Sequence, residues 1–316
     1  KKIPFTNPYE KNTRRDLKDI LLWKLGYYDD ENLESCTFFN YPISKKKDKL
    51  SSSFAIWVNH STFLIEIDGL RILTDPIWSK RCSPLPFLGS KRCHPPGIPF
   101  SQLPTIHLIL ISHDHYDHLD KQTVLALAKR FPQATRMVPQ QVKPWFDLQE
   151  IFPVYQCQWW QERVLTFPNR DSKRVKITAV PTQHFSGRKH WCLNDTLWVG
   201  WVLEFYEKSQ LAKKIYFVGD TGYNSIDFKQ IGERFSPIDF SFIMEENISE
   251  IFALFHQYKL KVNLIQNSAI SFSVCVEDKF ENFKDLNPIL SKKFKVDFND
   301  NVTLYTIRHF NDKAAQ

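Results

Sequence analysis

One short segment constrains this chain more than any other. Residues 112–120 read Ser-His-Asp-His-Tyr-Asp-His-Leu-Asp, and they follow directly after the near-continuous apolar run 106–111. An apolar run of this length predicts a central strand that is covered on both faces. A helix is predicted over 121–130, so the polar segment lies in a loop between a buried strand and a helix. Three histidines and several carboxylates are therefore concentrated at one strand end.

Four side chains in this loop have the chemistry of metal ligands, namely His113, His115, Asp117 and His118. Neutral imidazole nitrogens and carboxylates suit Zn²⁺ and similar divalent ions. Three crowded imidazoles repel one another when protonated and lose hydration when buried, and a bound metal ion removes both penalties. A histidine-rich surface loop is the alternative, which the position after a buried strand disfavours. The loop therefore predicts a metal site.

Two further segments supply candidate ligands. His184 follows the predicted strand 175–180, and Asp220 follows an apolar strand predicted over 215–218. The glycines on either side of Asp220-Thr221 allow the backbone to approach a ligand closely. Taken alone, His184 could be a core or surface histidine, and Asp220 could be a turn residue. Together with the histidine-rich loop, each becomes a candidate ligand.

The order of predicted elements indicates an α+β fold. Strands predominate before residue 105, and they include a hairpin in which Asp68-Gly69 forms the two-residue turn between strands 63–67 and 70–74. Strands and helices are interleaved after residue 105. We therefore expect an αββα four-layer sandwich, with two mixed sheets in the middle and helices outside.

The chain is predicted to have three parts. Residues 1–50 form a polar N-terminal arm with one helix near 14–25, and residues 51–243 form the main, catalytic domain. Residues 244–316 form a divergent C-terminal part of the same domain, with a helix near 249–260 and a strand near 302–308. The divergence is compositional, since no glycine follows Gly232 and no tryptophan follows Trp201.

Composition excludes several classes of protein. The 42% of hydrophobic and 24% of charged residues exclude a disordered chain, and no apolar run is long enough to predict a membrane-spanning helix. A net charge of +7 is too small to indicate a nucleic-acid partner, but it suits an anionic substrate or a membrane surface. Six cysteines without a CxxC pair indicate free thiols in a reducing compartment. We expect a cytoplasmic protein that can bind peripherally to a membrane.

The sequence resembles a known family in four strings: Leu73–Ser79, Leu110–Asp120, Gly219–Tyr223 and Arg234–Asp239. The order HxHxDH, a later histidine and then Gly-Asp-Thr-Gly is similar to that of binuclear metallohydrolases with the metallo-β-lactamase fold. The flanking strings are most similar to those of the N-acylphosphatidylethanolamine-hydrolysing phospholipase D group. The resemblance covers approximately residues 50–243.

This resemblance implies a set of roles for individual residues. One zinc ion would be held by His113, His115 and His184, a second by Asp117 and His118, and Asp220 would bridge the two. Asp117 and Asp220 would thereby also hold a bridging hydroxide at the catalytic centre. Tyr116 would contact the lipid, although a packing aromatic is equally compatible with the spacing. Asp75 and His60 would support the ligands from a second layer.

The implied activity is that of a zinc-dependent phosphodiesterase. A hydroxide shared by the two ions would attack phosphorus in line. Cleavage of the P–O bond on the head-group side of N-acylphosphatidylethanolamine would release an N-acylethanolamine and leave phosphatidic acid. The expected partner is therefore a phospholipid or membrane surface.

The resemblance fails toward the C-terminal end. The family completes its second metal with a histidine in an Ile-His-Trp-Gly stretch, and the nearest counterpart here is Ser271. His256 and His309 are the histidines that follow Asp220, and either is an alternative ligand. Two other functions therefore stay open: a hydrolase of this fold acting on a lactone or another phosphodiester, and an impaired metal-binding remnant or binding protein.

Overall fold

The protein divides into two compact units, Lys1–Met244 and Glu245–Gln316. The computed structural model describes residues 4–9, 53–83, 92, 95–167, 170–188, 193–222, 224–245, 255, 258–267, 272–277, 282–291 and 296. The boundary between the units lies one residue from the boundary predicted at 243. That both units belong to one domain stays a prediction.

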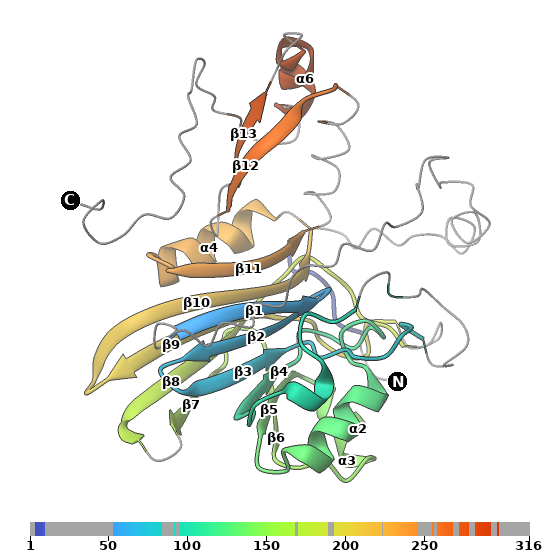
Figure 1. Ribbon diagram of the computed structural model, residues 1–316, viewed down its shortest axis with the longest axis vertical. Helices are drawn as coiled ribbons and strands as arrows, with labels where there is room; N and C mark the ends of the chain where they lie inside the picture. Colours follow the sequence, from blue (N-terminus) through green and yellow to red (C-terminus); the bar gives the residue numbers. More distant parts are fainter. Residues whose placement is uncertain are drawn as a thin grey trace. The chain divides into compact units, whose positions relative to one another are not determined.

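Two sheets form the centre of the first unit (Figure 1). The first sheet has the order β1 (Ser53–Asn59), β2 (Thr62–Ile67), β3 (Leu70–Thr74), β4 (Leu108–Leu110), β5 (Thr135–Pro139), β6 (Val154–Cys157). Strands β1 to β3 pair antiparallel, whereas β3 to β6 pair parallel. The second sheet has the order β11 (Phe240–Glu245), β10 (Gln210–Thr221), β9 (Gly200–Glu207), β8 (Arg170–Val180), β7 (Glu162–Phe167), and β7 to β10 pair antiparallel.

Apolar side chains hold these layers together in two clusters. One cluster lies between the sheets and joins side chains such as Ile72 and Leu110 of the first to Ile177 and Trp201 of the second. The other joins the opposite face of the first sheet to α2 (Lys121–Arg130) and α3 (Lys143–Asp147). Helix α4 (Ser225–Phe235) lies against the second sheet in Figure 1. These four layers confirm the predicted αββα fold class.

Strand β4 explains why the segment before the histidine-rich loop is apolar throughout. Leu108 and Leu110 belong to the cluster between the sheets, and Ile109 and Ile111 belong to the cluster under the helices. Successive side chains of a strand point to opposite faces. Both faces of β4 are therefore buried, as the sequence predicts, although the regular strand is shorter than the apolar run.

Several local predictions are confirmed. Ile67 pairs with Leu70, and the intervening Asp68 and Gly69 have φ values of 50° and 92°. Positive φ at both positions is typical of a type I′ hairpin turn. Helix α2 begins and ends where it is predicted.

Other elements are missed by the sequence analysis. Strand β7 alternates exposed side chains with more buried ones, which is typical of a strand with one solvated face. Helix α4 begins after Asn224, whose side chain accepts hydrogen bonds from the backbone N–H groups of Ile226 and Asp227. Asparagine at a helix start and apolar residues four apart, Ile231 and Phe235, were the available signals.

The ends of the chain are described only in part. Residues 4–9 are joined to the rest of the first unit, since the backbone N–H of Phe5 donates to the carbonyl of Asn194 at 2.8 Å. The helix predicted over 14–25 and the strand predicted over 302–308 lie outside the described residues, and the helix predicted over 249–260 lies largely outside them. Ser271, His256 and His309 are also outside.

The second unit contains an antiparallel pair of strands, β12 (Lys261–Asn267) and β13 (Phe272–Glu277), and helix α6 (Phe283–Leu290). A small apolar cluster joins Leu286 and Leu290 of this helix to Phe255 and Leu260. Within the described residues of both units, no helix is long and apolar enough to cross a membrane.

Candidate metal centre

The predicted ligands come from strand ends that meet at one edge of the sandwich. The loop with His113 and His118 follows β4, His184 follows β8, and Asp220 lies near the end of β10. A fourth contribution comes from the turn between β1 and β2, which carries His60. Among the described residues, donors gather here in three overlapping groups: His113 with His115 and His184, His60 with Asp117 and His118, and Asp75 with His113 and His118.

The first donor group consists of three imidazoles. His113 Nε2 lies 2.8 Å from His115 Nδ1, and His184 Nε2 lies 3.3 Å from the same Nδ1 atom. Two nitrogens bound to one tetrahedral zinc at about 2.0–2.1 Å are about 3.3 Å apart. One nitrogen of each ring therefore faces a common point, at spacings close to those a single ion requires.

The second donor group lies beside the first. His118 Nε2 is 3.8 Å from Asp117 Oδ2 and 3.1 Å from His60 Nε2, and His60 Nε2 is 3.3 Å from Asp117 Oδ2. Asp220 lies between the groups, since its Oδ2 atom is 3.1 Å from His118 Nε2 and 3.9 Å from His184 Nε2. A carboxylate in that position suits two neighbouring ions.

The third group has a different character, because both oxygens of the Asp75 carboxylate already accept hydrogen bonds. It accepts from the backbone N–H of Ser112 at 2.7 Å, from the Ser112 hydroxyl at 2.5 Å and from His118 Nδ1 at 2.7 Å. The Ser112 oxygen in turn lies 2.8 Å from His113 Nδ1. A partner on Nδ1 leaves Nε2 of each ring free to bind a metal. Asp75 therefore orients one histidine of each donor group.

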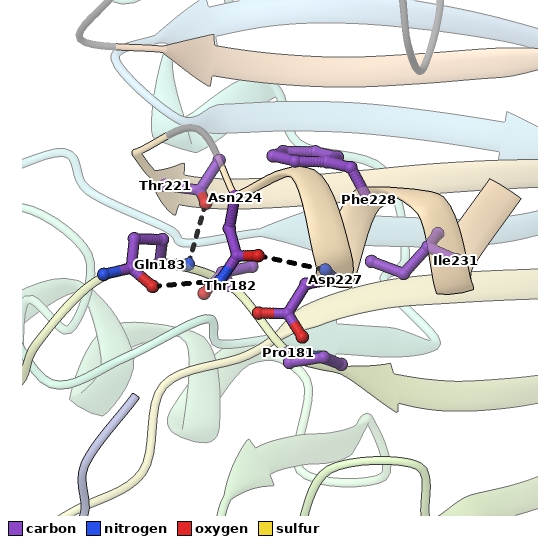
Figure 2. Close-up of a pocket in the computed structure, with 8 residues that line it drawn as sticks. All are labelled: Pro181, Thr182, Gln183, Thr221, Asn224, Asp227, Phe228 and Ile231. Atoms are coloured by element: carbon purple, nitrogen blue, oxygen red, sulfur yellow. Dashed lines mark hydrogen bonds between the residues drawn. The ribbon is translucent and has the colours of Figure 1, made fainter. Parts of the chain in front are cut away.

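The segments that carry His184 and Asp220 are fixed to each other. Figure 2 shows a pocket that both segments line, with the hydrogen bond from the Gln183 N–H to Thr221 Oγ1 at 2.9 Å. The Gly222 N–H also donates to the Gln183 carbonyl at 2.7 Å, and Asn224 Nδ2 donates to Gln183 Oε1 at 3.2 Å. These bonds set the spacing between the two ligands.

Residues near the chain start also hold the His184 segment. Asn7 Nδ2 donates to the His184 carbonyl at 2.9 Å, and Asn7 Oδ1 accepts from the buried Trp198 Nε1 at 3.1 Å. The sequence analysis treats this arm as separate from the main domain. Because the contact joins residues 177 positions apart, no local sequence pattern predicts it.

The electrostatics favour the protonation states that bind metals. Burial lowers the pKa of His113 well below its usual value and lowers that of His184 to about 3. Burial opposes ionisation of Asp117 and Asp220, but the neighbouring histidines, His118 foremost, together outweigh it, so both carboxyl pKa values fall, that of Asp220 to about 2. Neutral imidazoles and ionised carboxylates are the ligating forms.

His118 is the exception among the imidazoles. Burial lowers its pKa, but Asp220, Asp117 and Asp75 together outweigh burial and raise the pKa well above its usual value. A buried imidazole surrounded by three carboxylates requires a positive charge. A proton supplies it in the ion-free chain, and a divalent ion at Nε2 would replace that proton.

Tyr116 lies in the same loop but is held by other contacts. Its hydroxyl donates to the Arg188 carbonyl at 3.0 Å, and the Arg188 guanidinium lies 4.2 Å from the ring centroid. The guanidinium also donates to the carbonyls of Asp114 and Leu119. These contacts fix the histidine-rich loop to the segment after β8, which carries His184. The predicted contact between Tyr116 and a lipid stays a prediction.

The described residues fit a pair of divalent ions. All six predicted ligands, His113, His115, Asp117, His118, His184 and Asp220, lie together, and Asp75 lies behind them as a hydrogen-bonding partner. His60 is in a different position from the one expected, because its ring faces the donors directly. Ser112 and Asn7 are missed by the sequence analysis. The donor set of imidazoles and carboxylates is one that zinc binds readily.

Comparison with known proteins places this centre in a family. The sequence model of the beta-lactamase superfamily domain matches residues 70–251, which is more than half of the 316 residues. The chain belongs to this family, as its fold and the order of its donor segments indicate.

Three curated relatives are similar over more than half of the chain. N-acyl-phosphatidylethanolamine-hydrolyzing phospholipase D 1 of Caenorhabditis elegans is 34% identical over 61% of this chain and 53% of its own length. An uncharacterized protein of Mycobacterium tuberculosis is 40% identical over 59% of this chain and 47% of its own. The mitochondrial N-acyl-phosphatidylethanolamine-hydrolyzing phospholipase D of Saccharomyces cerevisiae is 30% identical over 57% and 36%. The chain thus spans about half the length, or less, of these relatives.

Proposed function

We propose that this chain is a metal-dependent hydrolase, and specifically a zinc-dependent phosphodiesterase acting on phospholipids of the N-acylphosphatidylethanolamine type. The observation that carries the proposal is the pair of adjacent donor groups, with the Asp220 carboxylate within 3.1 Å of one and 3.9 Å of the other. Paired ions suit the in-line displacement at phosphorus. The predominance of imidazole among the donors supports zinc over magnesium or calcium.

The residues of the site have different roles in the proposed reaction. When bound, the two ions would lower the pKa of a water molecule and neutralise charge on the phosphoryl oxygens. Asp75 holds the Nδ1 atoms of His118 directly, and of His113 through Ser112, so that both rings keep their ligating nitrogens turned inward. The side chain of Asp117 is 38% exposed, so an entering phosphodiester would approach from its side.

Hydrolysis would add one water molecule across the P–O bond on the head-group side. The water oxygen forms the new bond to phosphorus, and the oxygen of the N-acylethanolamine leaves and takes up a proton. Phosphatidic acid remains as the second product. His115, Asp117 and Asp220 would share the reaction centre. Burial lowers the pKa of His115, and the neighbouring histidines lower the pKa of the two carboxyl groups.

Two features support a lipid over a small soluble substrate. Two of the curated relatives are named for hydrolysis of N-acyl-phosphatidylethanolamine. In addition, Phe185 is 44% exposed, and its ring centroid lies 4.8 Å from those of both His115 and His184. An apolar ring beside the donors would contact an acyl chain. We further propose that the protein works at a membrane surface, where Tyr116 contacts the phospholipid.

The experiment is a substrate comparison on the purified, zinc-loaded full chain. Mixed micelles of N-acylphosphatidylethanolamine should yield N-acylethanolamine and phosphatidic acid by mass spectrometry. The chelator-stripped chain should yield neither product until zinc is returned. A soluble bis-aryl phosphate and a lactone serve as competing substrates. Turnover of either one without turnover of the micellar lipid would replace the proposal with another hydrolase of this fold.

A further inference from the structure

We propose that His60 is itself a ligand of the second metal ion, together with Asp117, His118 and Asp220. This inference rests on the proposed function, because it presupposes that the chain holds two ions. The turn between β1 and β2 would thus supply the imidazole that the resembled family takes from a C-terminal histidine. In this chain the nearest counterpart of that residue is Ser271.

Distances among the donor atoms carry the inference. His60 Nε2 lies 3.1 Å from His118 Nε2 and 3.3 Å from Asp117 Oδ2. Ligand atoms bound to one tetrahedral zinc lie about 3.3 Å from each other. The ring of His60 therefore presents its nitrogen to the same point as the two neighbouring donors. A supporting residue would instead lie behind a ligand and contact its far nitrogen, as Asp75 does with His118.

A hydrogen bond explains this arrangement less well than an ion does. His118 Nε2 already has Asp220 Oδ2 at 3.1 Å and His60 Nε2 at 3.1 Å. Two imidazole nitrogens that face each other can share at most one proton. The carboxylates of Asp117 and Asp220 lie 3.8 and 3.1 Å from the same His118 Nε2 atom, and they require positive charge. One divalent ion satisfies all four side chains at once.

The backbone holds His60 in an unusual conformation. Its φ of 39° lies in the left-handed region, which residues other than glycine adopt infrequently. The turn is fixed by a hydrogen bond from Trp57 Nε1 to the His60 carbonyl at 2.8 Å, and by the Asn59 side chain, which donates to the Ile77 carbonyl at 2.8 Å. Conformations of this kind persist where the surrounding contacts fix them, and they concentrate at functional sites.

The exposure of these side chains indicates which side of a bound ion would stay open to solvent. The side chains of His60 and Asp117 are 36% and 38% exposed, whereas that of His118 is fully buried. An ion among these donors would be enclosed on the side of His118 and open between the other two. A metal with an open position can accept water or substrate.

The test measures metal binding by three forms of the full chain: wild type, His60→Asn and His107→Gln. Asparagine tolerates positive φ, so it preserves the turn while removing the imidazole. His107 lies outside the donor groups, and its Nδ1 accepts from the Arg71 N–H, so its variant controls for the loss of any histidine. Thermal melting in chelator checks that each form folds.

The number of zinc ions per chain is measured by mass spectrometry during competition with increasing concentrations of a chelator. We expect two ions in the wild type and in His107→Gln. In His60→Asn the second ion should bind at least about 100-fold more weakly, because the loss of a ligand exceeds the loss of a residue that only supports a ligand. The affinity for the first ion should change less than about threefold. Two tightly held ions in His60→Asn would overturn the inference. The hydrolysis assay is separate, so lipid turnover by such a two-ion variant would leave the proposed function standing.

A crystal structure of the zinc-loaded wild type, with anomalous scattering at the zinc edge, supplies a readout that does not depend on folding of the variant. An ion about 2.0–2.1 Å from His60 Nε2 is expected. An ion more than about 3 Å away, or one completed by a histidine from the C-terminal part of the chain, would overturn the inference. A wild type that holds no ion at all would contradict the proposed function as well.

Discussion

The two donor groups of the candidate metal centre differ in how deeply they lie and how firmly they are held. In the first group, His113 and His184 are buried, and hydrogen bonds from Ser112 and Gln183 fix the loops that carry them. In the second, Asp117 is 38% exposed. The difference indicates that the first group is built to retain an ion, whereas the second faces the solvent from which a substrate arrives.

The largest effect is expected from a change within the first group. Nδ1 of His115 lies within 3.3 Å of both neighbouring imidazole nitrogens, so His115→Ala removes the central donor. We expect turnover of N-acylphosphatidylethanolamine to fall by more than about 100-fold, since the loss of a ligand exceeds that of an outer partner. Turnover at the wild-type rate would contradict a metal-dependent mechanism.

A change in the second group should separate the two ions. Asp117→Asn removes a charge from the open group and leaves the imidazoles of the first group unchanged. We expect the second ion to bind about 100-fold more weakly, while affinity for the first stays within about threefold. Chelator competition monitored by zinc analysis measures both. Equal weakening of the two ions would show that the groups do not act separately.

A matched pair of substitutions tests the residue that supports both groups. Asp75→Asn disturbs His118 directly and His113 through Ser112, so we expect both ions to bind about 10–100-fold more weakly. Ser112→Ala interrupts only the path to His113, and it should weaken the first ion by about tenfold. Asp75→Asn should also destabilise the fold by about 1–3 kcal/mol, because it disrupts a buried network.

The contrast between these two variants is the informative result. Both should be measured by the same zinc competition, with urea unfolding of the metal-free chain for stability. If Ser112→Ala weakened both ions as much as Asp75→Asn does, Asp75 would not be the link between the two groups.

The smallest effect is expected outside the donors. Phe185 lies beside the first group and is 44% exposed, so Phe185→Ala should remove apolar contact with an acyl chain without removing a ligand. A loss of about 1 kcal/mol corresponds to an approximately fivefold lower kcat/KM on micellar lipid. Zinc content and turnover of a soluble phosphodiester should not change. An equal loss on both substrates would remove the lipid role of this ring.

Much of the fold and of the site can be predicted from short stretches of the sequence. The apolar run before Ser112 predicts β4, because both faces of that strand are buried. The histidine-rich loop predicts a metal site because its donors are neighbours along the chain. His184 and Asp220 are found because the first follows a strand and the second lies near the end of one, and strand ends meet at the edges of sheets.

Other features depend on contacts that no local pattern encodes. Asp75 reaches Ser112 across 37 positions, and Asn7 reaches the His184 carbonyl across 177. The direction of the His60 ring follows from a positive φ in a tight turn, which the sequence Asn-His-Ser-Thr does not specify. These are the features for which sequence reasoning gave only a general supporting role, or none.

The described donors are expected to hold two divalent ions. The most direct measurement is the zinc content of the purified full chain, loaded with zinc, freed of excess metal and analysed by mass spectrometry against protein concentration. Two zinc ions per chain are expected. One ion, or none, in a chain that is folded by circular dichroism would contradict this expectation.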